Sequence, residues 1–216
     1  MIVATTDELD AVASACAFLA HLFLRKEAGP ATLANVDANL AAAWPLSGRA
    51  QGAADTERGV ALLGRAVTAP APVSDLAADH TRLFVGPGPM KACPWESVHR
   101  SEEGLTFEAE TLQVRRAYAE AGFEAPALNR EPDDHIGLEL AFLGELAVAA
   151  LDAREGGDAA AEAFALSAAG AFVRDHLGVW APGFADLVIE HAATDLYRAA
   201  GHLLRGALPT FEAVLA

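Results

Sequence analysis

The densest group of side chains with chemical potential lies in the segment EPDDHIGLE, residues 131–139. His135 and Glu139 are four residues apart, so on a helix they share one face, close to the adjacent carboxylates of Asp133 and Asp134. An imidazole beside carboxylates can hold a metal ion or carry acid–base chemistry. The spacing differs from the HExxH of zinc peptidases, because no second histidine follows one helical turn later.

Two further interpretations of this segment stay open. In the first, the acids cap a helix N-terminus, where carboxylates are favoured, and His135 and Glu139 form a pair that stabilises the helix. In the second, the carboxylates form a pocket for guanidinium groups, which bind carboxylates strongly through two-point contacts. The residue types alone are compatible with all three interpretations.

A second unusual segment is LFVGPGPMKACPWESV, residues 83–98. Three prolines and two glycines between Val85 and Pro94 exclude a helix and predict a long ordered loop. Phe84 precedes this loop, and Trp95 directly follows Pro94; such a tryptophan either fills the core or forms the wall of a peptide groove. GPGP lacks the GK[ST] of a phosphate loop, and its prolines remove amides that would bind phosphate, so nucleotide binding has little support.

Other candidate residues are weaker. One stripe of polar residues at helical spacing is more typical of a solvated surface than of a ligand set: His191, Asp195, Arg198 and His202. His21 lies in an apolar segment and is expected to be a buried imidazole. No GxSxG or Cys–His signature is present. We therefore expect no catalysis, no cofactor and no metal.

Helical periodicity dominates the chain, and β-branched runs are absent. We expect one helix that ends near Gly29-Pro30, one that begins near Asp133 and ends at the turn 155–158, and others over residues 35–44, 56–67, 75–84, 102–121, 159–176 and 184–204. The spacing of apolar residues in the helix after Asp133 predicts that it buries Ile136, Leu140, Leu143 and Ala147. The predicted fold class is all-α: a single compact helical bundle over residues 1–216, with long loops between helices.

Composition narrows the possible partners. The 15 basic and 30 acidic residues give a net charge of −15, which repels nucleic acid and anionic membranes and attracts basic peptides. The most apolar stretch, Ala11 to Leu24, has 14 residues, fewer than the roughly 20 of a membrane span. The N-terminus lacks the features of a secretory signal, and the two cysteines, Cys16 and Cys93, form no CxxC. These features predict a cytoplasmic protein with reduced thiols.

The two unusual segments together resemble the TorD/DmsD family of redox-enzyme maturation chaperones. The resemblance covers about residues 79–205 and is carried by these pieces: Leu83-Phe84 with the GP loop, Pro94-Trp95-Glu96-Ser97, Glu131-Pro132-Asp133-Asp134-His135 with Glu139, His176-Leu177, Trp180-x-Pro182-x-Phe184 and Tyr197-Arg198. His80 and His99 depart from the family, which more often has aromatic residues there.

This resemblance implies an all-helical, cytoplasmic, non-catalytic protein, and we expect a monomer or a dimer. Its partner would be the twin-arginine signal peptide on the precursor of a molybdopterin-containing oxidoreductase, whose cofactor insertion it assists before export. The family's peptide-binding positions correspond to Leu83, Phe84, Pro94, Trp95, Asp134 and His135, and we add the neighbouring Asp133 and Glu139. A leader with two arginines and an apolar segment suits carboxylates beside an apolar groove.

Two alternative functions stay open. One is a nitrate-reductase-type assembly chaperone, whose client enzyme faces the cytoplasm. The other, from a different class, is a metal-dependent hydrolase that uses Asp133, Asp134, His135 and Glu139. Stoichiometric metal in the purified protein would separate the hydrolase from both chaperones.

Overall fold

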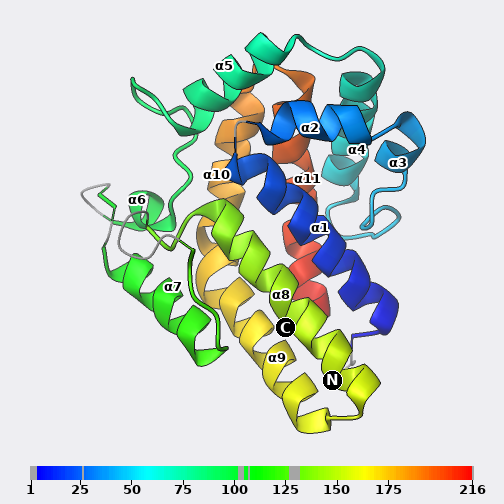
Figure 1. Cartoon of the computed structure of the whole chain (residues 1–216), viewed down its shortest axis with the longest axis vertical. Coiled ribbons are helices and arrows are strands. Elements are labelled where there is room, and N and C mark those ends of the chain that lie inside the picture. The colour runs from blue at the N-terminus through cyan, green and yellow to red at the C-terminus, as the bar shows by residue number, and fades with distance from the viewer. Residues whose placement is uncertain (1–3, 26, 102–104, 107, 127–131, 216) are drawn as a thin grey trace. The chain divides into compact units, whose positions relative to one another are not determined.

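Helices form the regular structure of this protein (Figure 1). The structure is a computed structural model that describes residues 4–25, 27–101, 105–106, 108–126 and 132–215. Its elements are α1 (Thr6–Leu24), α2 (Ala28–Asn35), α3 (Ala38–Ala42), α4 (Ala53–Thr68), α5 (Val73–Phe84), α6 (Glu96–Arg100), α7 (Ala109–Glu120), α8 (Ile136–Gly156), α9 (Ala159–Phe172), the π-helix η1 (Val173–Leu177), α10 (Gly178–His191) and α11 (Asp195–Leu215). Over those ranges there is no β-strand, and one isolated bridge joins Trp95 to His135. The all-α prediction is confirmed.

The chain divides into two compact units, each assembled from separate stretches of sequence. The first unit comprises Met1–Ala20, Trp95–Trp180 and Phe211–Ala216, and the second comprises His21–Pro94 and Ala181–Thr210. The expectation of a single domain over residues 1–216 stays a prediction. Within the described residues, no helix combines the length and the apolar character needed to cross a lipid bilayer.

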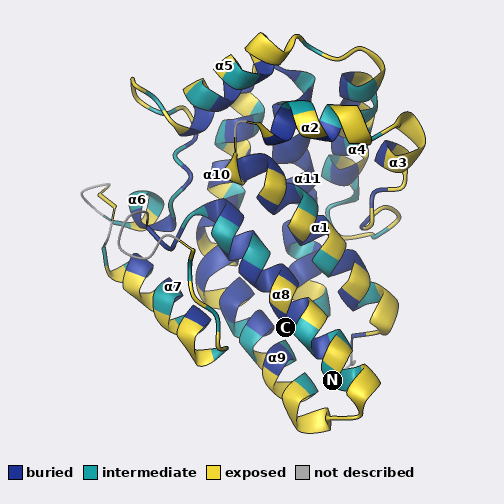
Figure 2. Ribbon diagram, viewed as in Figure 1, coloured by how far each residue is buried: buried dark blue, intermediate teal, exposed yellow. Residues whose placement is uncertain are grey.

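The first unit is built on α8, which packs against α9 (Figure 1). Figure 2 shows that α8 is buried along much of its length. The face that the sequence predicted to be buried is fully enclosed: Ile136, Leu140, Leu143 and Ala147. Gly144 on the same helix faces α1, where an added Cβ would lie 3.2 Å from the Cβ of Cys16. Small residues therefore let these two helices approach closely.

The start of α8 differs from the expected acidic cap. His135 is the N-cap residue, and its Nδ1 accepts a hydrogen bond from the amide of Gly137 at 3.0 Å. Asp133 and Asp134 precede the cap and direct their carboxylates elsewhere in the first unit. The interpretation of these acids as helix caps is therefore wrong, because the imidazole takes the role that a capping carboxylate would have.

The second unit has an aromatic cluster at its core. Phe84 packs against the rings of Phe23, Phe184 and Tyr197 with centroid separations of 5.7, 6.0 and 5.9 Å. These separations are typical of stabilising aromatic pairs. Elsewhere in this unit Gly206 lets α11 approach α4, since an added Cβ would lie 2.4 Å from the hydroxyl of Thr56.

Two predicted helix boundaries near the N-terminus are wrong. Gly29-Pro30 is not a break, because α1 already ends at Leu24 and both residues lie in the first turn of α2. Proline is tolerated there since first-turn amides have no acceptor within the helix. The helix expected over residues 35–44 is the short α3, and the carboxylate of Asp37 caps it by accepting from the amide of Leu40.

Two boundaries in the later half also differ. The helix expected over 102–121 begins at Ala109, and residues 102–104 and 107 lie outside the described residues. Ser101 contributes to this delay, because its hydroxyl accepts from the amide of Leu105 and competes with a helical turn. The break expected at residues 180–183 does not occur, since Pro182 lies inside α10. Proline removes one helical hydrogen bond there, and η1 directly before α10 is a distortion of the kind that accompanies such an interruption.

Candidate functional site

The residues of the predicted site fall in both units. Trp95, Asp133, Asp134, His135 and Glu139 belong to the first unit, where the structure brings them together. The other three belong to the second unit: Leu83, Phe84 and Pro94. Glu131, part of the family motif, lies outside the described residues.

In the second unit, Leu83 and Phe84 form the end of α5, and both side chains are buried. The proline-rich loop that follows is ordered against this helix end, as predicted. The amide of Ala92 donates to the carbonyl of Leu83 at 3.0 Å, and that of Lys91 donates to the carbonyl of Arg82 at 3.3 Å. Gly86 takes a φ of +100°, a conformation that favours glycine, at the turn out of the helix. Pro94, at the end of the loop, is also buried.

His80, where the resemblance leads us to expect an aromatic residue, packs among aromatic rings. Its ring meets Phe84 edge-on at 5.1 Å and Tyr197 at 5.8 Å. The imidazole is buried and stands in the same cluster that holds Phe84. The departure noted in the sequence therefore keeps the packing of an aromatic side chain.

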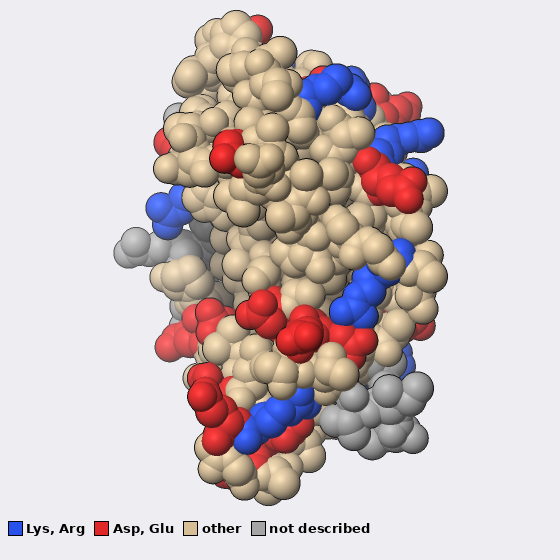
Figure 3. Space-filling model, turned by 90° about the vertical axis from the view of Figure 1, so that its right-hand side faces the viewer, with Lys and Arg blue, Asp and Glu red and all other residues tan. Residues whose placement is uncertain are grey.

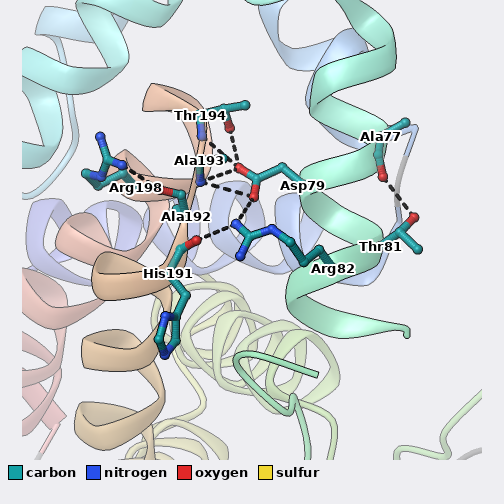
Figure 4. Close-up of polar contacts among 9 residues, drawn as sticks. All are labelled: Ala77, Asp79, Thr81, Arg82, His191, Ala192, Ala193, Thr194 and Arg198. Carbon is teal, nitrogen blue, oxygen red and sulfur yellow. Dashed lines mark hydrogen bonds and ion pairs between the residues drawn. The ribbon is translucent and has the colours of Figure 1, made fainter. Parts of the chain in front are cut away.

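Sequence reasoning missed a buried polar centre at Asp79, one residue before His80. Figure 4 shows its carboxylate pointing at the N-terminus of α11, where it accepts from the amides of Ala193 and Thr194. The hydroxyl of Thr194 also donates to it at 2.8 Å, as does the guanidinium of Arg82 at 2.7 Å. A carboxylate at a helix N-terminus is stabilised by the exposed amides and by the helix dipole.

Asp79 also explains why the helix expected over 184–204 is interrupted. Residues 192–194 leave helical geometry between α10 and α11, and the amides of Ala193 and Thr194 are bound by the carboxylate of Asp79. Arg82 donates to the carbonyl of His191, the last residue of α10 (Figure 4). The end of one helix and the start of the next are thus both held by α5.

In the first unit, Trp95 and His135 form the best exposed part of the predicted site. Both side chains are partly buried, and their rings meet edge to face at 5.9 Å. Their backbones form the isolated bridge, in which the amide of Glu96 donates to the carbonyl of Asp134 at 3.0 Å. An indole beside an imidazole offers apolar area and polar edges to a ligand.

Asp134 supports this pair from inside the unit. Its side chain is fully buried, and its carboxylate accepts from the amide of Ser97 at 2.7 Å and from the hydroxyl of Thr111 at 2.8 Å. One side chain therefore joins α6, α7 and the segment before α8. Because both oxygens are engaged, direct binding of a guanidinium group would require these bonds to open.

Asp133 is engaged in a similar way. Its carboxylate receives the guanidinium of Arg115, and its backbone carbonyl accepts from the hydroxyl of Tyr118 at 3.1 Å. Burial raises the pKa of Tyr118, and nearby carboxylates including Glu139 and Asp133 raise it further. The phenol is therefore held as a donor. The pair with Arg115 shows that this carboxylate binds a guanidinium group through its Oδ2 atom.

Glu139 lies on the first turn of α8 and is fully buried. Its carboxyl accepts from the indole nitrogen of Trp180 at 3.0 Å and lies beside the carboxyl of Glu96. Glu96 in turn contacts His176 Nδ1 at 2.8 Å. Of these partners, sequence reasoning noted only that their motifs match the family. No spacing rule could have joined residues that are 41 and 80 positions apart.

A metal-dependent hydrolase would need a group of side chains that can ligate a metal ion. Within the described residues, no three His, Cys, Asp or Glu side chains are grouped so that they could hold a metal ion. The polar stripe noted in the sequence is divided between two helices and is largely engaged in ion pairs. Asp195 binds Arg65 at 3.0 Å, and His202 Nδ1 lies 2.8 Å from the carboxylate of Asp55.

Comparison with known proteins places this arrangement in a family. The sequence profile of the nitrate reductase delta subunit family matches residues 50–186, which contain every residue of the predicted site. A Tat proofreading chaperone DmsD from Salmonella typhi is 33% identical over 134 residues, which are 62% of this chain and 59% of that protein. A chaperone protein TorD from Vibrio cholerae serotype O1 is 33% identical over 129 residues, 60% of this chain and 57% of that protein.

A further TorD, from Aliivibrio fischeri, is 30% identical over 130 residues, which cover 60% of this chain and 59% of the relative. The chain thus spans less than two thirds of the length of these relatives. The profile match covers well over half of the chain. The chain therefore belongs to the nitrate reductase delta subunit family, which includes the TorD/DmsD-type chaperones.

Proposed function

We propose that this protein is a cytoplasmic, non-catalytic chaperone that binds the twin-arginine signal peptide of a molybdopterin-containing oxidoreductase, assists cofactor insertion and delays export until the enzyme is ready. The observation that carries the proposal is the similarity to relatives named as Tat proofreading and TorD chaperones. The family profile match over residues 50–186, which contain the whole predicted site, supports it. The charge of the chain supports a basic ligand, since its net value is −15. Figure 3 shows acidic side chains gathered in groups on the face that it draws.

The proposed leader-binding residues are Leu83, Phe84, Pro94, Trp95, Asp133, Asp134, His135 and Glu139. Trp95 and His135 support a direct role best, because they are the two that are only partly buried. The buried carboxylates of Asp133 and Asp134 support a positioning role, since each joins separate segments of the first unit. We propose that they fix the Trp95–His135 pair in the orientation that receives the leader.

A binding experiment with a precursor enzyme tests this function. The purified full chain should bind a molybdopterin oxidoreductase precursor that carries its twin-arginine leader, and should bind the same enzyme at least tenfold more weakly once the leader is removed. Equal binding to both forms would favour the nitrate-reductase-type alternative, in which the client is recognised without an export signal. Stoichiometric zinc that disappears in a His135→Ala variant would instead support the hydrolase.

A further inference from the structure

Two buried carboxyl groups face each other in the first unit. Glu139, on the first turn of α8, and Glu96, the first residue of α6, have no exposed side-chain surface. Their carboxyl groups lie within hydrogen-bonding reach of each other. Ionised carboxylates only accept hydrogen bonds, so this contact requires a proton on one of the two groups.

The remaining partners show which group holds the proton. Glu96 accepts from the guanidinium of Arg100 through Oε1, and its Oε2 lies 2.8 Å from His176 Nδ1, so both of its oxygens are occupied. Glu139 accepts from the indole nitrogen of Trp180 through Oε2, while its Oε1 meets no hydrogen-bond donor among the described residues. Burial, with the negative charge of Glu96, raises the pKa of Glu139 well above its usual range.

Other charged and titratable groups around the pair point the same way. Asp134 lies close enough to penalise a second negative charge on Glu139, and the phenol of Tyr118 interacts with the same carboxyl. The nearby cations already pair with other carboxylates: Arg100 with Glu96 and Arg115 with Asp133. Two further histidines lie on neighbouring segments: His135 at the start of α8, and His99 on α6 against Trp180.

We propose that Glu139 is a neutral carboxylic acid whose proton is shared with the carboxylate of Glu96, and that this proton holds α6 against α8 as a pH-sensitive latch. Loss of the proton to hydroxide would leave two adjacent negative carboxylates in a buried site. Their repulsion and burial would strongly disfavour the arrangement in which α6 is held against α8. Trp95 is the N-cap residue of α6, so release of Glu96 would move Trp95 as well. The consequence for leader binding rests on the function proposed above.

Infrared spectroscopy tests the proton directly, without a ligand. At neutral pH the protein should show the C=O band of a buried protonated carboxyl group, and this band should disappear reversibly as the pH is raised. The band should be absent in Glu139→Gln, an isosteric change whose amide can still donate to Glu96. It should persist in the control Glu145→Gln, an exposed site on the same helix. A neutral-pH spectrum without the band, or a band that persists in Glu139→Gln, would overturn the proposal.

The emission of Trp180 provides an independent measurement, because its indole donates to Glu139. The chain has three tryptophans, so Trp44→Phe with Trp95→Phe leaves Trp180 as the sole emitter. Its emission should change with the same midpoint as the infrared band, and adding Glu139→Gln should abolish the change while far-UV circular dichroism stays helical. An identical transition in the presence of Glu139→Gln contradicts the latch.

Leader affinity measured across the same pH range separates the two proposals. A loss of affinity at the midpoint, absent in Glu139→Gln, joins the latch to leader binding. If the infrared and emission transitions occur while the leader never binds, the latch stands and the proposed function fails.

Discussion

Trp95 and His135 meet twice, once through their backbones and once through their side chains. The backbones form an antiparallel bridge, and the rings pack edge to face at 5.9 Å. They are 40 positions apart in the sequence, and the carboxylate of Asp134 supports the contact by fixing the amide of Ser97 beside the same bridge. The pair is the part of the predicted site that a ligand can reach with least rearrangement.

Replacement of Trp95 should weaken leader binding. Trp95→Ala removes a large aromatic surface and should cost about 2 kcal/mol or more in affinity for a twin-arginine leader, the range of an aromatic anchor at a binding interface. Trp95→Phe keeps an edge-to-face partner for His135 and should retain part of that affinity. Fluorescence titration with the leader measures both. Wild-type affinity in a folded Trp95→Ala protein would assign this side chain to packing alone.

Replacement of Asp134 should destabilise the fold moderately without abolishing it. In Asp134→Asn the remaining oxygen can accept from the amide of Ser97 while the new NH₂ group donates to the hydroxyl of Thr111. Charge-assisted bonds become neutral, so the free energy of unfolding should fall by about 1 to 3 kcal/mol. Urea denaturation measures this, and a matched Thr111→Val variant keeps the charge while it removes one partner.

The same variant distinguishes contact from positioning at Asp134. If Asp134 receives an arginine of the leader, the affinity lost on changing that leader from RR to KK should shrink in the Asp134→Asn background. If Asp134 positions Trp95 and His135, the two losses should add. A double-mutant cycle by calorimetry supplies the comparison.

The junction of α10 and α11 should depend on Asp79. Asp79→Ala leaves the amides of Ala193 and Thr194 and the guanidinium of Arg82 without this acceptor, and should cost about 3 kcal/mol in stability or more. Asp75→Asn, at an exposed position on the same helix, should change stability by no more than about 0.5 kcal/mol. Chemical denaturation of the two variants side by side tests the difference; equal effects would show that Asp79 is dispensable.

The carboxyl groups of Asp55 and Glu139 should make the stability of the fold depend on pH in opposite directions. Burial opposes the charged form of Asp55, but hydrogen bonds from Arg205 and His202 outweigh it and lower its pKa. Its contribution is therefore present above the usual value of about 3.9 and is lost as the pH falls through the folded pKa. The raised pKa of Glu139 has the reverse sign: its contribution is complete below about 4.3 and is lost as the pH rises through the folded pKa.

Urea denaturation at a series of pH values checks both signs. The Asp55→Asn variant should lack the stability that this carboxylate contributes in wild type. Its free energy of unfolding should therefore fall less than that of wild type on acidification. Glu139→Gln should flatten the decline on the alkaline side. A Glu139→Gln curve parallel to that of wild type above pH 4.3 would contradict the assigned direction.

Local patterns predicted the helices well where packing follows spacing, as for Ile136, Leu140 and Leu143 on α8. They failed where a side chain that is distant in the sequence determines the backbone conformation. Asp79 interrupts residues 192–194 from more than 110 positions away, and no periodicity encodes that contact. The site shows the same division. The motifs identified Asp134 and His135, but the burial of Asp134 and the capping role of His135 depend on Ser97, Thr111 and Gly137 in three dimensions.

Calorimetric titration of the full chain with a synthetic leader tests the central claim most directly. The peptide should contain two consecutive arginines followed by an apolar segment, and the control should have the same composition in scrambled order. We expect saturable one-to-one binding of the leader that weakens as salt increases, because partly exposed charge pairs are screened. The scrambled peptide should bind at least tenfold more weakly. Equal binding of both peptides, or no binding of either to the folded protein, would contradict a leader-binding function.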